Sequence, residues 1–187
     1  MNRKRLSLRR ATTVCQKPPG ELVHPICGFF LYIRTIRKTN DYPLHHVYGA
    51  DEVGIWIDAA AKTTVAHTGD REIGIRSTGH DRLCITVLLA ARADGYKIPP
   101  FVLIPRKRQI KELDKYRGSL NICYSGQQSW MDEPKTEEFL RTAVGRHMFG
   151  ARKLLVWDSF RPHFSERTKA ICAQLNIDLA IIPGIIC

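Results

Sequence analysis

The sequence has no apolar run of membrane-spanning length, which needs about 18 or more residues. The basic N-terminus MNRKRLSLRR is not followed by an apolar stretch, so we expect no secretory signal peptide. With 187 residues, 44% of them hydrophobic, the chain is long enough for one domain with a core plus extensions. We therefore expect a soluble intracellular protein with no membrane partner.

Paired cysteines are also lacking, because none of the six cysteines forms a CxxC pair and all are widely spaced. A zinc site or a disulfide framework is therefore not expected. Two of them, Cys84 and Cys172, lie in apolar stretches and are predicted to be small core residues. Free thiols fit a reducing compartment. The six positions are Cys15, Cys27, Cys84, Cys123, Cys172 and Cys187.

Acidic residues are scarce at the front of the chain. Of the net charge of +11, most comes from residues 1–50, which carry 9 Lys and Arg against 2 Asp and Glu. Such asymmetry indicates a polyanionic partner, most often nucleic acid, although a solvated basic tail is the alternative. The candidate DNA-binding arm, which is also a candidate nuclear import signal, consists of Arg3, Lys4, Arg5, Arg9 and Arg10.

The chain divides near residue 45. Residues 1–44 are interpreted as a basic arm ending in KPPG and a helical linker, with apolar spacing that predicts a helix from Pro25 to Lys38. The segment TNDYP then ends the helix. Residues 45–187 form the second region, with no internal repeat and no low-complexity tract.

The second region begins with strand patterns. Residues 45–58 predict a strand, and 62–69 and 72–80 predict two short ones. The clearest hairpin joins 83–91 to 98–104 through a turn containing Asp94-Gly95. The near-continuous apolar run of its first strand predicts burial on both faces. A basic loop, PRKRQIK, follows.

Helices and strands alternate in the last third. Asp132 is a predicted N-cap for a helix reaching Met148, and Ser165 for a helix through about Leu175. KLLVWD, ending at Asp158, predicts a buried strand, and 178–184 predicts another. Several strands come first, and helices and strands then alternate. This order predicts a mixed α/β sheet flanked by helices.

Two of these core strands carry an aspartate, Asp51 and Asp158. If the strands are neighbours, the two carboxylates converge and repel each other unless a divalent cation lies between them. Strand alternation sends Glu52 to the opposite face from Asp51, and Glu52 is interpreted as strand surface. A loop-capping or arginine-paired role for Asp158 is the alternative. The chain lacks GxxxxGK[ST], which argues against a nucleotide-binding P-loop.

Eight segments follow one another in a characteristic order: LSLRRATTVCQKPP, NDYPLHHVYGADE, KTTV, STGHDR, LLAARADGYKIPPFVLIPRK, SWMDE, LLVWDSFRPH and NIDLAIIPGI. Together they resemble the catalytic domain of pogo/Tigger-type DDE transposases, whose host-derived relatives include Jerky and centromere protein B. The resemblance covers nearly the whole chain, and the order of the segments makes it specific.

The resemblance implies an RNase H-like fold with an acidic metal site. Its first two acids fall on Asp51 and Asp158, and the signature around the second also supplies Arg161 and His163. It further implies Mg²⁺ or Mn²⁺ as cofactor, DNA as partner, nuclear residence, and self-association as an open expectation. The activity implied is metal-dependent DNA strand cleavage and transfer.

The sequence departs from the family pattern at both ends. The third family acid lies downstream of the IPGG-like segment and is absent, and Asp178 does not take its place. The upstream helix-turn-helix domains are also absent. We therefore expect a partial catalytic domain over 45–187, with the C-terminal part of the fold missing. The alternatives are a non-catalytic, domesticated or eroded DNA-binding protein, or a chain that does not fold stably.

The neighbouring residues leave alternatives open. His163 could position Asp158 or a phosphate, or bond only to backbone. Arg161 could contact a substrate phosphate or pair with an acid. Trp130 and Trp157 are interpreted as core residues in preference to base-stacking platforms. The loop residues Arg106, Lys107 and Arg108 are either phosphate contacts or solvated.

Overall fold

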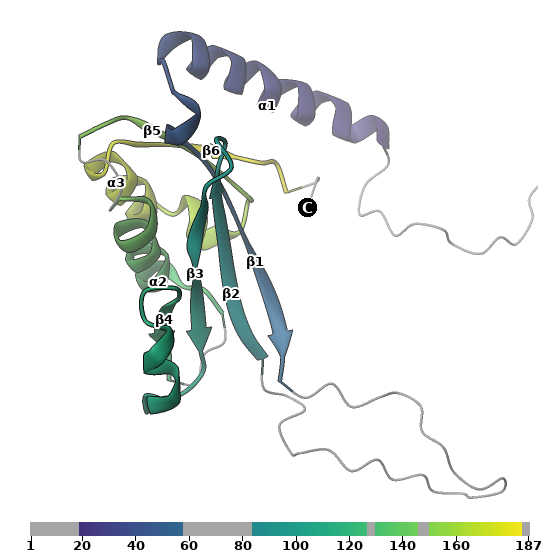
Figure 1. Ribbon diagram of the computed structural model, residues 1–187. Coiled ribbons are helices and arrows are strands. Elements are labelled where there is room, and N and C mark those ends of the chain that lie inside the picture. The colour runs from purple at the N-terminus through teal and green to yellow at the C-terminus, as the bar shows by residue number, and fades with distance from the viewer. Residues whose placement is uncertain (1–18, 58–83, 127–129, 146–149, 185–187) are drawn as a thin grey trace, which may run out of the picture.

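The described part of the chain is built around one sheet with helices on both of its faces (Figure 1). The computed structural model describes residues 19–57, 84–126, 130–145 and 150–184. Six strands lie in the order β4-β3-β2-β1-β5-β6. They are β1 Val47–Trp56, β2 Cys84–Arg92, β3 Lys97–Ile104, β4 Asn121–Tyr124, β5 Lys153–Trp157 and β6 Ile177–Ile181.

The sheet is mixed, as the sequence predicts. β1, β2 and β3 form an antiparallel meander, whereas β4, β5 and β6 each run parallel to a neighbour. The predicted turn between β2 and β3 is present, and Gly95 has a φ of +91°, a left-handed conformation that glycine adopts without strain. The short edge strand β4 was not predicted.

Within the described ranges, three α-helices accompany the sheet: α1 Pro19–Thr39, α2 Glu133–Phe139 and α3 Glu166–Gln174. Both predicted N-caps are confirmed, because Asp132 accepts a hydrogen bond from the Lys135 N–H at 3.0 Å and Ser165 accepts one from the Thr168 N–H at 3.2 Å. A π-helical turn, Leu140–Val144, continues α2. The helix α1 begins earlier than predicted and contains Pro25.

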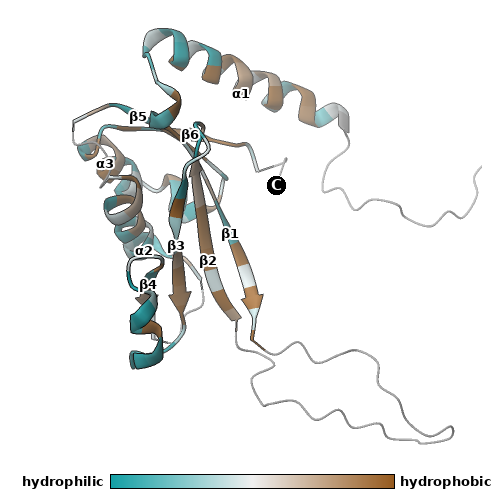
Figure 2. Cartoon of the chain, in the orientation of Figure 1, coloured by the Kyte–Doolittle hydropathy of each residue, from teal (hydrophilic) through white to brown (hydrophobic). Residues whose placement is uncertain are grey.

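Strand alternation in β5 divides the core between the two faces. Leu155 and Trp157 join the main core, formed with α2 and α3, whereas Leu154 and Val156 contact a smaller cluster with α1 residues. Figure 2 shows the apolar colouring of β2 and β3 in the centre of the sheet. In β2 the predicted two-sided burial is wrong at Leu89, which is half exposed on the face opposite to that of Leu88 and the main core.

Polar bonds fix α1 and the following loop onto β6. Tyr32 donates to the Leu179 carbonyl at 3.0 Å, and Tyr42 donates to the Asp178 carboxylate. Arg152 binds both oxygens of Asp178, at 2.6 and 3.0 Å, and this bond lowers the pKa of Asp178. Burial, followed by the Asp178 bond, raises the pKa of Tyr42 to about 12. Asp178 is thus engaged in holding two elements together.

The buried thiols of Cys84 and Cys172 confirm that part of the cysteine prediction. Burial raises the pKa of Cys172 to about 12, which suits an inert core thiol. Several predicted features lie outside the described residues: the basic arm, the short strands 62–69 and 72–80, Met148, Cys15 and Cys187. No helix in the described part of the chain is long and apolar enough to cross a membrane.

Lys153, at the start of β5, is almost fully buried, and burial lowers its pKa below 10.5. The folded state therefore binds this proton less tightly than the unfolded state, so the free energy of unfolding should rise with pH up to the ordinary lysine range. We expect Lys153→Met to be at least as stable as wild type at pH 7, with its advantage shrinking by about pH 10.

Urea unfolding at both pH values measures this effect, with the exposed Lys97→Met as a matched control. A difference between Lys153→Met and wild type that is the same at both pH values would contradict the prediction.

Candidate functional site

The candidate site lies where β5 ends beside β1. β1 pairs with β5 only over Val47–Gly49, opposite residues 154–156. Beyond Gly49, β1 extends past the end of β5. Asp51 and Glu52 therefore both reach the space next to Asp158, the residue directly after β5. A hollow of about 220 Å³ results, lined by Asp51, Glu52, Gly54, Thr86, Trp130, Met131, Asp158 and Phe160.

His163 lies in the interior of this site and joins two of its acids. Its ring is fully buried, its Nδ1 contacts Asp158 Oδ1, and its Nε2 lies 2.9 Å from Glu52 Oε1. The ring stacks on Trp157 with centroids 3.7 Å apart and meets the Phe160 ring edge-on at 5.3 Å. Packing and hydrogen bonds therefore fix the imidazole in one orientation.

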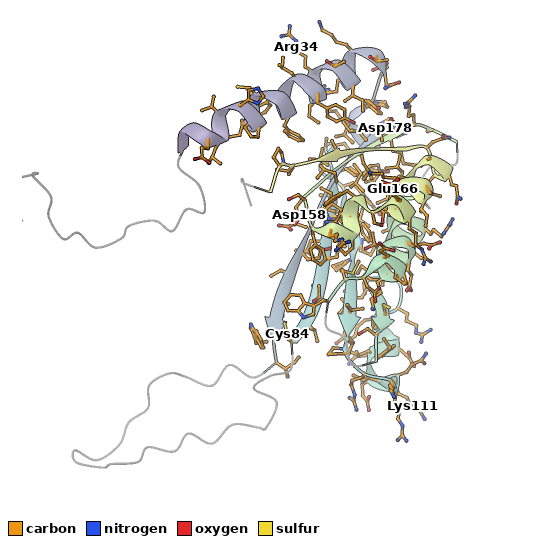
Figure 3. The ribbon with its side chains drawn as sticks, turned by 180° about the vertical axis from the view of Figure 1, so that it is seen from behind. Arg34, Cys84, Lys111, Asp158, Glu166 and Asp178 are labelled. Carbon is orange, nitrogen blue, oxygen red and sulfur yellow. The ribbon has the colours of Figure 1, made fainter. Side chains whose placement is uncertain are left out.

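The carboxylate of Asp158 is held through one oxygen. Oδ1 accepts from the Phe160 N–H at 3.2 Å as well as contacting His163. Among the described residues, the hydrogen bonds to this carboxylate all go to Oδ1, which leaves Oδ2 as a ligand for a cation. Figure 3 shows Asp158 near the middle of the molecule, apart from Asp178 near α1.

Asp51 is exposed, and its Oδ1 accepts from the Glu52 N–H at 2.9 Å. The closest set of potential metal ligands in the described chain is Glu52, Asp158 and His163, whose ligand atoms lie within 4.8 Å of one another. The two predicted acids, Asp51 and Asp158, thus line one hollow. Glu52 is linked to Asp158 through the ring of His163, which contacts both carboxylates.

The interpretation of Glu52 as strand surface was wrong. Alternation along β1 places Glu52 in phase with Tyr48 and Ala50, which pack against the main core, and its side chain is only 17% exposed. The alternation of side chains along β1 could be seen in the sequence. Whether Glu52 is buried depended on which face of the sheet the helices cover, and the sequence did not show that. For His163, contact with Asp158 is the arrangement present.

The predicted basic contacts are distributed around the sheet. Arg161 is exposed at the start of the 3₁₀ turn Arg161–Phe164, next to the site. The exposed residues Arg106, Lys107 and Arg108 follow β3, two strands from β1 and at the same end of the sheet as the end of β1. The candidate arm, Arg3 to Arg10, lies outside the described residues.

The two tryptophans behave differently. Trp157 is fully buried, which confirms its interpretation as core, whereas Trp130 is 70% exposed and that interpretation was wrong. The neighbouring Met131 occupies the buried position instead. Gly184 was also overlooked: it passes so close to Ser159 that a Cβ there would collide with the Ser159 hydroxyl oxygen. The segment after β6 therefore returns to the neighbourhood of Asp158.

The fold defines the class. The Mos1 strand transfer complex gives a TM-score of 0.54 at 11% identity, covering 95% of this chain and 46% of that one. A Mos1 mariner paired end complex with Mn gives 0.52 at 10% identity, with 93% and 46% coverage. The mixed sheet and helices are thus the RNase H-like fold of the Mos1 transposase catalytic domain, as the resemblance implied.

The sequence defines the family. Residues 82–186 match the family described as DDE superfamily endonuclease, and the chain belongs to this family. The chain is 30% identical over 189 aligned positions to "Pogo transposable element with KRAB domain" of Mus musculus and of Homo sapiens. The alignment covers 98% of this chain and 30% of each relative, so the chain spans about a third of their length.

Proposed function

We propose that this chain is a transposon-derived DNA endonuclease domain that uses a divalent metal ion. The observation that carries the proposal is the meeting of Asp51, Glu52 and Asp158, from β1 and the end of β5, around one hollow. Hard cations such as Mg²⁺ and Mn²⁺ prefer oxygen ligands of this kind. One similar structure is a Mos1 mariner paired end complex with Mn, which supports a divalent metal without deciding between Mg²⁺ and Mn²⁺.

The residues that would hold the metal are Asp51 and Asp158, with Glu52 adjacent. The carboxylate of Asp158, bonded only through Oδ1 among the described residues, and the exposed carboxylate of Asp51 fit this role, since both residues line the hollow. When bound, the ion would activate a water molecule and stabilise the leaving oxygen of a phosphodiester. Without it, clustered carboxylates would repel a phosphate.

Each remaining side chain has a proposed part. His163 is the positioning residue: it holds Asp158 through Oδ1 and is itself held by Glu52 and Trp157. Arg161, which is exposed three residues after Asp158, would contact a substrate phosphate. Arg106, Lys107 and Arg108 would bind the DNA backbone further along the sheet, where phosphate contacts position the duplex without reading its sequence.

We infer that DNA is the substrate and that the protein acts in the nucleus. The net charge of +11 supports a polyanionic partner, and its concentration in the first 50 residues supports an arm that follows the DNA backbone or directs nuclear import. One similar structure is a Mos1 transposase paired-end complex with a left transposon end, which supports DNA as the class of substrate. Self-association is part of the same proposal.

DNA binding without cleavage is the second candidate. The basic charge alone would support it, and it requires neither a metal nor the third family acid. Such binding would weaken steeply with salt, because each neutralised phosphate releases counterions.

Nicking of supercoiled plasmid tests the first candidate. We expect wild type to nick DNA in Mg²⁺ or Mn²⁺ and not in EDTA. Asp51→Asn should reduce the rate by about three orders of magnitude because it removes a direct metal ligand. Glu52→Gln should reduce it only about 10- to 100-fold, because Glu52 acts through His163.

Equal nicking by wild type and Asp51→Asn would exclude the proposed metal site. A larger loss in Glu52→Gln than in Asp51→Asn would assign the metal to Glu52 instead. Salt-sensitive DNA binding with no nicking under any of these conditions would establish the second candidate.

A further inference from the structure

Two aromatic side chains on the rim of the acidic hollow are left open to solvent. Trp130 is 70% exposed and Phe160 is 41% exposed, and both line the hollow together with the acids. Trp157 and Phe139, by contrast, are large rings buried in the main core. An exposed tryptophan beside an acidic site is a feature of the surface that packing does not explain.

Both aromatic residues are attached to firmly held backbone. Trp130 precedes the buried Met131 and the helix cap Asp132, whose side chain bonds to the Lys135 N–H. Phe160 donates its N–H to Asp158 and rests edge-on against the buried His163 ring, at an interplanar angle of 78°. These contacts hold the backbone of both residues in place, while a large part of each side chain is exposed to solvent.

The surface between them is suited to a flat, apolar ligand. Gly54 contributes no side chain to the hollow, and the remaining lining residues there are Thr86 and Met131. The acids line the same hollow, which has a volume of about 220 Å³. This combination suits a nucleotide, because the acids would hold the metal that binds its phosphate and the aromatic rings would contact its base.

We propose that Trp130 and Phe160 form a stacking site for one unpaired nucleobase next to the cleaved phosphate. The inference rests on the proposed nuclease function and deepens it by naming the substrate feature: DNA with an unpaired base at the cleavage point, in preference to continuous duplex. Aromatic side chains stack on any base, because every base has a π-face. Paired bases cannot reach the site without first being unstacked, which costs free energy that an unpaired base does not require.

The experiment compares two short, fluorescently labelled duplexes that differ only in one central unpaired base. Anisotropy gives the affinity of the full chain for each, with Ca²⁺ replacing Mg²⁺ to prevent cleavage. Trp130→Ala and Phe160→Ala remove the rings, Trp130→Phe and Phe160→Tyr keep a stacking ring, and Phe30→Ala removes a 65% exposed ring on α1 as a matched control. Thermal melting verifies that each variant is folded.

We expect wild type to prefer the duplex with the unpaired base. Each alanine variant should lose at least about fivefold of that preference, whereas the aromatic replacements and Phe30→Ala should keep it. Unchanged preference in both alanine variants would overturn the stacking site and leave the nuclease proposal, which the plasmid assay judges separately. Failure of wild type to bind either duplex would overturn both.

Discussion

Replacing Asp158 with asparagine is expected to remove metal-dependent nicking while leaving the chain folded. Asparagine keeps the shape of the side chain and an oxygen that can accept from the Phe160 N–H, so the loop after β5 should keep its conformation. The negative charge that would attract the cation is lost. Stabilisation by a catalytic metal is worth several kcal/mol, which corresponds to about three orders of magnitude or more in rate.

Plasmid nicking in Mg²⁺ or Mn²⁺, with thermal melting of each variant, measures this effect. Asp114→Asn is the matched control: it makes the same substitution at an aspartate paired with Arg117 and outside the acidic hollow. Nicking by Asp158→Asn within tenfold of wild type would mean that Asp158 does not hold the metal.

Replacing His163 has the second-largest expected effect, and it should act on both stability and activity. His163→Ala removes a fully buried ring that stacks on Trp157, and it leaves Glu52 and Asp158 without the group between them. The cavity and the lost hydrogen bonds should lower the free energy of unfolding by about 2 kcal/mol or more. Losing the group that positions a metal ligand should reduce nicking about 10- to 100-fold.

Two further variants separate positioning from simple stabilisation. His163→Asn places an amide N–H near the Nδ1 position and can still donate to Asp158, whereas His163→Gln places it near Nε2 and can donate to Glu52. If His163 acts by holding Asp158, then the asparagine variant should recover more nicking than the glutamine variant at equal stability. Nicking that follows only the melting temperature across all three variants would argue against a positioning role.

Much of the fold could be predicted from local chemistry. Asp94-Gly95 specified the β2–β3 turn, and Asp132 and Ser165 specified the starts of α2 and α3, because each acts on backbone groups within a few residues. β4 was missed because it has only four residues and is stabilised by parallel pairing with β3, a contact between segments far apart in sequence. Nor did spacing reveal the π-helical turn before Gly145, where a Cβ would approach the Leu140 carbonyl oxygen to 2.9 Å.

The candidate site was predictable in part for the same reason. Asp51 lies within one strong strand pattern and Asp158 directly follows another, so their convergence required only that the two strands be neighbours. The role of Glu52 depended on where β5 stops, because the edge of β1 opens only beyond Trp157. Trp130 was misassigned because hydrophobicity alone did not show that Met131 would take the buried position.

The bridge from His163 to Glu52 joins residues 111 positions apart in the sequence. Closing so long a loop costs conformational entropy before the contact is made. A ribosome must release the chain beyond His163 before these groups can meet. If the proposed function holds, a growing chain would therefore lack part of the site until its last quarter has been made.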